Sequence, residues 1–235
     1  VVRVGDRHRA VREHRHAQRV LQPGLGGLPV AEAEVEQALA DGGLNGDGTA
    51  VANHKLARGL GSRAQRYLAT SKRMLSDEAF HGIELVLTTL AVDDKLSLDL
   101  GGRTLLLETQ RTAHTDNDLT VTDSATNTLF LGDLLFSVHV PTLDGSILGW
   151  LALIDDLKKR NAARVVPGHG PHAMELPEAF EPEQVYLAAI VTDVRNLIKE
   201  GKTLEDATKT AGFEERDAWK LFDHYNVRNV TAAFA

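Results

Sequence analysis

The chain of 235 residues contains no cysteine, and it has only two methionines and two tryptophans. The lack of cysteine excludes disulfide bonds, thiolate nucleophiles and sulfur-based zinc sites, while it leaves the cellular compartment open. No apolar run approaches the roughly 18 residues that span a bilayer, so we expect no membrane partner. The net charge of −7 argues against a nucleic-acid partner, which would require a basic surface.

What is present is the composition of an ordinary globular protein. The hydrophobic fraction of 43% and the charged fraction of 25% suit a chain that folds around a core. The length predicts one domain, or one domain with an appendage. The sequence starts with Val1 rather than with an initiator methionine or an apolar signal peptide, so we expect it to begin inside a longer reading frame.

The first 42 residues differ from the rest in composition and in apolar pattern. Residues 1–22 carry six arginines and only two acidic residues, without a helical or strand-like apolar period, so they predict no packed element. A Gly- and Pro-rich loop at 23–29 and a run of helix formers at 30–40 follow. We interpret residues 1–42 as an atypical segment, either disordered or translated out of frame.

From residue 43 onward the pattern becomes regular. A helix-compatible stretch, broken by Gly59 and Gly61, covers 53–78. Strand-like runs follow at 83–90, 95–100, 104–109, 119–122, 128–131 and 164–167. The run at 95–100 alternates with period two, and Gly101-Gly102 predicts a hairpin turn into the next run. Helical spacing occurs at 145–159 and 185–199, after the cap at 203–206, and at 214–225. Strands alternating with helices, followed by a helical tail, predict an α/β or α+β fold.

Three positions between or after the strand-like runs carry metal-binding chemistry. They are His114, Asp133 behind a glycine at the end of an apolar strand, and His169 between two glycines. Two imidazoles and a carboxylate on separate strand-end loops suit a divalent ion such as zinc. Singly, each has a plainer interpretation, because a loop histidine is more often a surface residue and Gly-Asp is more often a turn. Together and in this order, they indicate a site.

The order Ala-His114-Thr, Phe-Leu-Gly-Asp133-Leu-Leu-Phe and Val-Pro-Gly-His169-Gly-Pro resembles the later motifs of the metallo-β-lactamase-fold hydrolases. The runs 112–119, 140–150 and 226–234 look more specifically like the quinoprotein relay system zinc metallohydrolases, relatives of sulfur-oxidation-associated metallohydrolases. The resemblance covers about residues 43–235. It implies a partial metallo-β-lactamase-like domain at 43–181, with an αβ/βα sandwich incomplete at the N-terminus, and a C-terminal helical extension at 182–235.

The same resemblance implies roles for individual residues. His114, Asp133 and His169 would be ligands of one or two zinc ions, with Asp133 bridging and also a catalytic candidate. Asp116 is a further candidate for a ligand or base, and Asp118 and His139 are candidates for contacts to the substrate or to the ligands. A surface turn is the alternative interpretation of both Asp116 and Asp118. The implied chemistry is attack by a metal-activated water on an ester, thioester or amide-like bond of a small molecule.

One family motif is missing. The superfamily's His-x-His-x-Asp-His string should lie upstream, and the nearest match, His14-Arg-His16-Ala-Gln18-Arg19, has Gln and Arg in place of Asp and His. Residues 1–42 could be out of frame, or the chain could have lost its metal pair. We therefore predict a zinc-dependent hydrolase impaired in this chain, with a degenerate or truncated protein of weak or no metal binding as the alternative. The resemblance also suggests a periplasmic location, and the oligomeric state stays open.

Overall fold

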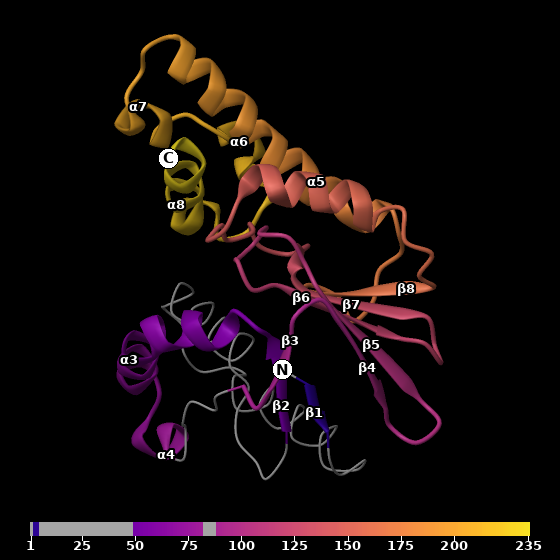
Figure 1. The fold of residues 1–235 in the computed structure, drawn as a ribbon. Coiled ribbons are helices and arrows are strands. Elements are labelled where there is room, and N and C mark those ends of the chain that lie inside the picture. Colours follow the sequence, from indigo (N-terminus) through magenta and orange to yellow (C-terminus); the bar gives the residue numbers. More distant parts are fainter. Residues whose placement is uncertain (1, 5–48, 82–87) are drawn as a thin grey trace. The chain divides into compact units, whose positions relative to one another are not determined.

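The computed structural model describes residues 2–4, 49–81 and 88–235. The predicted helix at 30–40, the residues His14 and His16, and most of the predicted strand at 83–90 therefore lie outside the described residues. The chain forms two compact units, Val1–Val92 and Asp93–Ala235, which we describe separately (Figure 1). The predicted boundaries at residues 42 and 181 stay predictions.

The first unit contains a three-stranded sheet and two helices. Strand β1 (Val2–Val4) runs antiparallel to β2 (Thr49–Asn53), and β2 runs parallel to β3 (Leu90–Val92). Helices α3 (Leu56–Met74) and α4 (Asp77–Phe80) lie between β2 and β3 in the chain. A small cluster of buried side chains joins α3 to β2, made of Ala52, Leu56 and Leu60.

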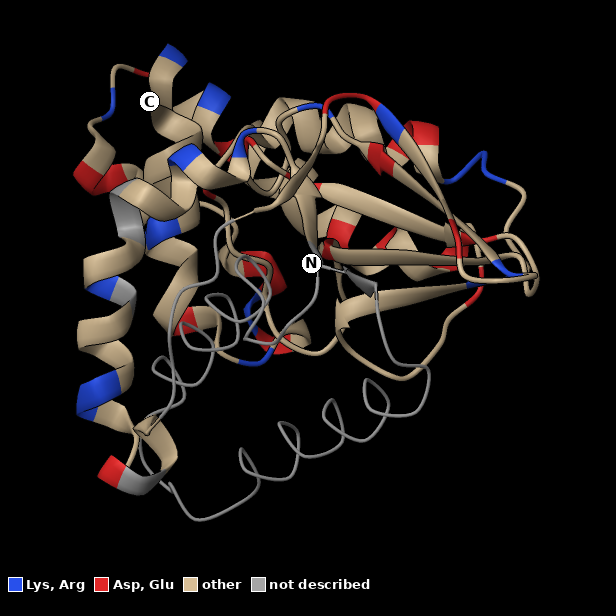
Figure 2. Cartoon of the chain, turned by 60° about the horizontal axis from the view of Figure 1, so that its bottom comes forward, with Lys and Arg blue, Asp and Glu red and all other residues tan. Residues whose placement is uncertain are grey.

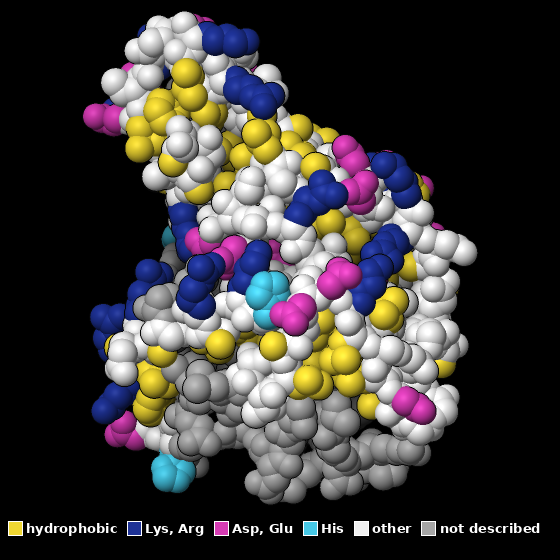
Figure 3. Space-filling view, in the orientation of Figure 1, with side chains coloured by type: hydrophobic (Ala, Val, Ile, Leu, Met, Phe, Trp, Pro, Cys, Tyr) yellow, Lys and Arg dark blue, Asp and Glu magenta, His cyan; other side chains and the backbone are white. Residues whose placement is uncertain are grey.

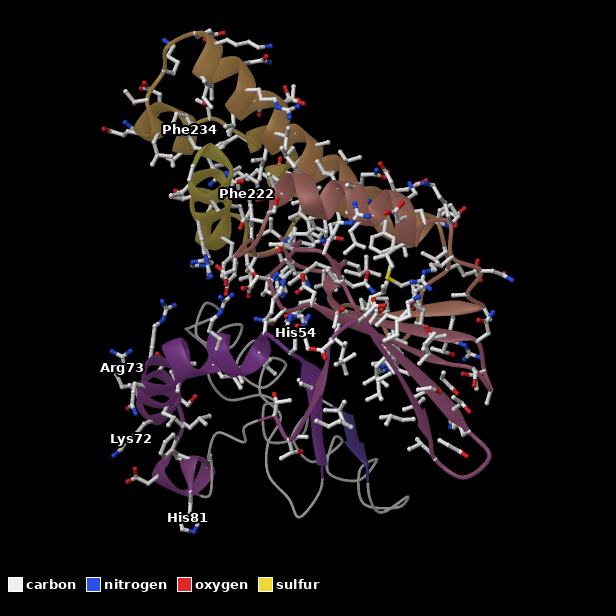
Figure 4. All side chains as sticks on the ribbon, in the orientation of Figure 1. His54, Lys72, Arg73, His81, Phe222 and Phe234 are labelled. Atoms are coloured by element: carbon white, nitrogen blue, oxygen red, sulfur yellow. The ribbon has the colours of Figure 1, made fainter. Side chains whose placement is uncertain are left out.

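Helix α3 continues through Gly59 and Gly61, so the predicted interruption at these glycines is wrong. Each glycine costs a helix only about 1 kcal/mol relative to alanine, and the packing of an apolar face outweighs that cost. Basic residues alone supply the charges along α3 (Figure 2). Lys72 and Arg73 lie in its last turn, where they stabilise the negative end of the helix dipole, and His81 is exposed after α4 (Figure 4).

The second unit is built on a five-stranded sheet of order β4-β5-β6-β7-β8. Its strands are β4 (Lys95–Asp99), β5 (Thr104–Thr109), β6 (Leu119–Asp123), β7 (Thr128–Phe136) and β8 (Arg164–His169). Neighbours are antiparallel as far as β7, whereas β7 and β8 are parallel. Gly101 and Gly102, at φ +77° and +85°, form the predicted turn between β4 and β5.

Helices cover the second unit and form its C-terminal part. They are α5 (Ile147–Leu157), α6 (Glu181–Lys199), α7 (Leu204–Thr208) and α8 (Phe222–Phe234), with short 3₁₀ helices at Glu178–Phe180 and Phe213–Ala218. Helix α5 is the crossover between the parallel strands β7 and β8, and it buries Trp150. The predicted cap of α7 is confirmed as a capping box between Thr203 and Asp206. This mixed architecture with C-terminal helices confirms the predicted fold class.

The predicted single helix at 214–225 is wrong. The chain forms a 3₁₀ helix there, becomes extended at Trp219, and starts α8 only at Phe222, whose position is marked in Figure 4. The interruption has a tertiary cause, because the backbone of Lys220 pairs with the segment after β7. Its carbonyl accepts from N of Val140 at 3.0 Å, and its N–H donates to the carbonyl of Val138 at 3.4 Å.

The surface of the helical C-terminal part is partly apolar. Hydrophobic side chains gather on it in Figure 3, and the exposed ones in α6, α7, α8 and the 3₁₀ helix are Val185, Ile198, Leu204, Phe213 and Val227. Single exposed apolar residues are common on soluble proteins. Within the described parts of the chain, each helix is either too short or too polar to cross a bilayer.

Candidate metal centre

His114 lies in the loop between β5 and β6 and is 1% exposed. Its Nδ1 is 2.6 Å from the carbonyl oxygen of Thr142. Because a carbonyl only accepts, Nδ1 must carry a proton and donate it to this oxygen. Nε2 is buried, has no hydrogen-bond partner among residues 2–4, 49–81 and 88–235, and lies 3.6 Å from Oδ2 of Asp133.

Asp133 lies inside β7, so its predicted place beyond the end of a strand is wrong. The strand continues to Phe136 because its pairing with β8 shifts register on either side of Gly132, which has φ +53°. Such a bulge re-aims side chains without ending the strand. Gly168 on β8 provides the space, since a Cβ there would lie 2.2 Å from Oδ1 of Asp133.

His169 is the last residue of β8, two residues beyond the predicted end of that strand. Its Nε2 lies 3.4 Å from Oδ1 of Asp133. The ring stacks on Phe136, with 4.6 Å between centroids, and meets the ring of His139 edge-on at 4.5 Å. His139 Nδ1 is 2.9 Å from the carbonyl of Val140. The structure therefore brings His114, Asp133, His169 and His139 together.

The two distances between nitrogen and carboxylate oxygen exceed the usual 2.7–3.2 Å of hydrogen bonds. They are close to the roughly 3.3 Å that separates two ligands on a tetrahedral zinc with bonds of about 2.0 Å. The two imidazoles lie near different oxygens of Asp133: His114 faces Oδ2 and His169 faces Oδ1. In the described part of the chain, no group of three or more His, Cys, Asp and Glu side chains is arranged to hold a metal ion. The ligand assignment stays a prediction.

Asp118 is buried, so a surface turn is the wrong interpretation for this residue. Its carboxylate accepts hydrogen bonds from N of Thr115 at 3.0 Å and from Oγ1 of Thr115 at 2.6 Å. Burial raises the pKa of Asp118, although the neighbouring His114 and the bonds from Thr115 act in the opposite direction. Asp116 is half-buried and accepts a hydrogen bond from Nδ2 of Asn117 at 3.2 Å. Both acids thus belong to the turn that presents His114.

Glu183, at the start of α6, is a buried acid that sequence analysis missed. Its Oε1 accepts a hydrogen bond from N of Phe136 at 3.1 Å, whereas its Oε2 has no hydrogen-bond partner among the described residues. Burial raises the pKa of Glu183 well above its ordinary value, and the charge of Asp133 adds to this. A signal was present, since Glu183 precedes Leu187 by four residues on the apolar face of α6.

Residues 47–169, slightly more than half of the chain, match the sequence profile of the Metallo-beta-lactamase superfamily. The chain belongs to this superfamily. The matched region contains His114, Asp133 and His169, with His169 as its last residue. Curated proteins give no significant match to the sequence.

Two solved structures share the fold of this chain at low sequence identity, and a third is similar over a smaller part of it. A family protein from Thermus thermophilus has a TM-score of 0.55 and 14% identity over 79% of this chain and 64% of that one. The stereoselective inverting sec-alkylsulfatase Pisa1 from Pseudomonas sp. has a TM-score of 0.54 and 11% identity, over 79% and 36%. A metallo-beta-lactamase from Pontibacter korlensis has a TM-score of 0.46 and 18% identity, over 60% and 58%. The chain thus spans less than two thirds of the length of each.

Proposed function

We propose that the chain is a zinc-dependent hydrolase of the metallo-β-lactamase superfamily, with His114, Asp133 and His169 as metal ligands. The observation that carries the proposal is the carboxylate of Asp133, whose two oxygens each face Nε2 of a different imidazole within 3.6 Å. The substrate would be a small molecule with an ester, thioester or amide-like bond. The runs at 112–119, 140–150 and 226–234 support the quinoprotein relay system subgroup and a periplasmic location as part of this proposal.

The chemical types of these side chains suit zinc. Two imidazoles and a carboxylate are zinc's usual oxygen and nitrogen ligands, and the bond from Nδ1 of His114 to a carbonyl is the kind of outer contact that orients a ligating histidine. When bound, zinc supplies Lewis acidity that lowers the pKa of a water molecule toward about 7. The rings of Phe136 and Trp150 pack around His114, with centroids 5.8 and 5.4 Å away, and keep solvent from that side of the imidazole.

The remaining candidates take supporting roles in this proposal. His139 contacts the ring of His169 and would limit how that imidazole turns. Asp118 anchors the turn that carries His114 through its bonds to Thr115. Asp116, two residues from His114 and half-buried, is the carboxylate proposed to accept a proton from the attacking water.

The deciding experiment is the zinc content per chain after exhaustive dialysis, by elemental analysis. We expect near-stoichiometric zinc in the wild-type chain and little in the His169→Ala variant. His172→Ala is the matched control, since His172 is an exposed histidine three residues further along and should retain zinc. Absence of zinc from the wild-type chain would contradict the proposal and favour the alternative, a degenerate family member with weak or no metal binding.

A hydrolase assay then tests the reaction class. Wild-type protein with zinc should cleave at least one member of a panel of thioesters, lactones and lactams, and the His169→Ala variant should not. Zinc binding without cleavage of any ester, thioester or amide-like bond would separate the metal site from the proposed activity.

A further inference from the structure

Asn229 of helix α8 reaches back to the segment that follows β7. The residue is fully buried. Its Oδ1 accepts a hydrogen bond from N of Leu143 at 2.9 Å, and its Nδ2 donates one to the carbonyl of Pro141 at 2.6 Å. Asn229 therefore holds the residues on both sides of Thr142.

Thr142 is the residue that orients His114. Its carbonyl oxygen accepts the hydrogen bond from Nδ1 of the imidazole at 2.6 Å. Two residues further on, N of Asp144 donates a hydrogen bond to the carbonyl of His114 at 2.9 Å. Both the ring and the backbone of His114 are thus held by the segment that Asn229 holds.

The orientation of the Asn229 amide follows from its partners. The N–H of Leu143 can only donate and the carbonyl of Pro141 can only accept, so a flipped amide would set donor against donor. Nδ2 of Asn229 also donates to the hydroxyl of Tyr186 at 2.9 Å, and this hydroxyl donates to Oδ1 of Asn226 at 2.9 Å. This buried network joins α6 and α8 to the segment, and such networks are rigid when their members are satisfied.

We propose that Asn229 is a positioning residue for His114, which keeps the imidazole proton on Nδ1 and directs Nε2 at Asp133 by holding the Thr142 carbonyl in place. A residue of the C-terminal helices thereby becomes part of the site. For zinc the inference rests on the proposed function, whereas the state of the imidazole in metal-free protein is independent of it. Loss of an outer partner of a ligating histidine typically weakens metal binding 10–100-fold.

The direct test is long-range ¹H–¹⁵N spectroscopy of the imidazoles in the metal-free full chain, with the His114 signals assigned by a His114→Ala variant. Wild-type His114 should be protonated on Nδ1. Asn229→Ala should shift it toward protonation on Nε2, the form that free imidazole prefers. Val230→Ala is the matched control, because Val230 is the next residue on α8, is fully buried, and offers no polar side-chain atom to the segment.

Zinc affinity, measured by competition with a chelator, is the second readout. Asn229→Ala should bind zinc more weakly, with 10–100-fold as the upper limit because the Thr142 carbonyl itself is retained, and Val230→Ala should bind it as the wild type does. If Asn229→Ala does not fold, Asn229→Asp replaces it, since an aspartate keeps the acceptor for Leu143 and loses the amide donor to Pro141.

Two results would overturn the inference: an unchanged His114 signal in the folded Asn229 variant, or an equal change in Val230→Ala, which would indicate general destabilisation. The experiment tests the proposed function and the positioning role independently of each other. If the wild-type chain binds no zinc but the His114 signal responds to Asn229, the positioning role stands without the metal site. If zinc binds and the signal does not respond, only the positioning role is lost.

Discussion

Two groups of buried carboxylates in the second unit are stabilised in different ways. Glu108 on β5 and Asp123 on β6 pair with basic side chains, Glu108 with Lys95 at 2.8 Å and Asp123 with Arg103. Near β7, Asp118 accepts its hydrogen bonds from Thr115, Glu183 accepts one from a backbone N–H, and Asp133 faces two imidazoles.

The pKa values separate the same two groups. Burial alone would raise the pKa of Glu108, but hydrogen bonds from Lys95 and Arg160 outweigh burial and lower it. The hydrogen bond from Arg103 lowers the pKa of Asp123 far below its ordinary value. Burial raises the pKa of Asp118 and of Glu183. Carboxylates compensated by arginine and lysine stabilise the sheet, whereas acids with raised pKa values gather where a site is proposed.

The largest effect is expected when one aspartate from each group is replaced by asparagine and the two variants are compared. Asp133→Asn should weaken zinc binding by more than the roughly 100-fold that loss of an outer partner can cost, since it removes a proposed ligand. Asp123→Asn should leave zinc content unchanged and lower the free energy of unfolding, because Arg103 loses its charged partner. Elemental analysis and urea denaturation measure the two effects.

The stability effect of Asp123→Asn should depend on pH. A folded-state pKa below the unfolded value near 3.9 gives stability that is present above that pH and is lost as the pH falls. The variant should therefore differ from the wild type at pH 7 and approach it in acid. Equal zinc loss in both aspartate variants would contradict the division into two groups.

A smaller effect on the free energy of unfolding is expected when one glycine in each unit is replaced by alanine. Gly168→Ala would place a Cβ 2.2 Å from Oδ1 of Asp133 and 2.7 Å from the backbone of Gly132, so we expect it to cost about 1–3 kcal/mol and to reduce zinc retention. Gly61→Ala in α3 is the control, because its Cβ would meet nothing within 4 Å, and it should stabilise by about 0.5–1 kcal/mol. Urea denaturation of both variants checks the signs, and equal effects would rule out a special role for Gly168.

The smallest expected effect concerns Glu183. Its raised folded-state pKa gives stability that is complete below the unfolded pKa of about 4.3 and is lost as the pH rises. Glu183→Gln keeps the acceptor for the N–H of Phe136, so it should match the wild type near pH 4 and become the more stable protein toward pH 8. The exposed Glu181, in the same turn of α6, provides the control Glu181→Gln for loss of a negative charge at the helix N-terminus. A constant difference across this pH range would show that Glu183 does not titrate as proposed.

Much of the second unit could be predicted from local sequence. The alternation at 95–100 and the glycines between it and the run at 104–109 predicted the first hairpin, because a period of two and a turn are properties of neighbouring residues. The apolar spacing of α5 and the cap of α7 were equally local. The failures at Gly59 and at 214–225 share one cause, since tertiary packing overrode local preference in α3 and tertiary hydrogen bonds interrupted the helix at Lys220.

The sequence by itself determined most strands and helices of the second unit, though not the end of β7 or the break before α8. It also gave His114, Asp133 and His169 as candidates, because residue type and spacing carry that information. Only the tertiary structure decided how they are held. The bulge at Gly132 depends on pairing with β8, and the contacts of Asn229 span 86 and 88 residues of the chain. Contacts at such separations arise from packing and leave no period in the sequence.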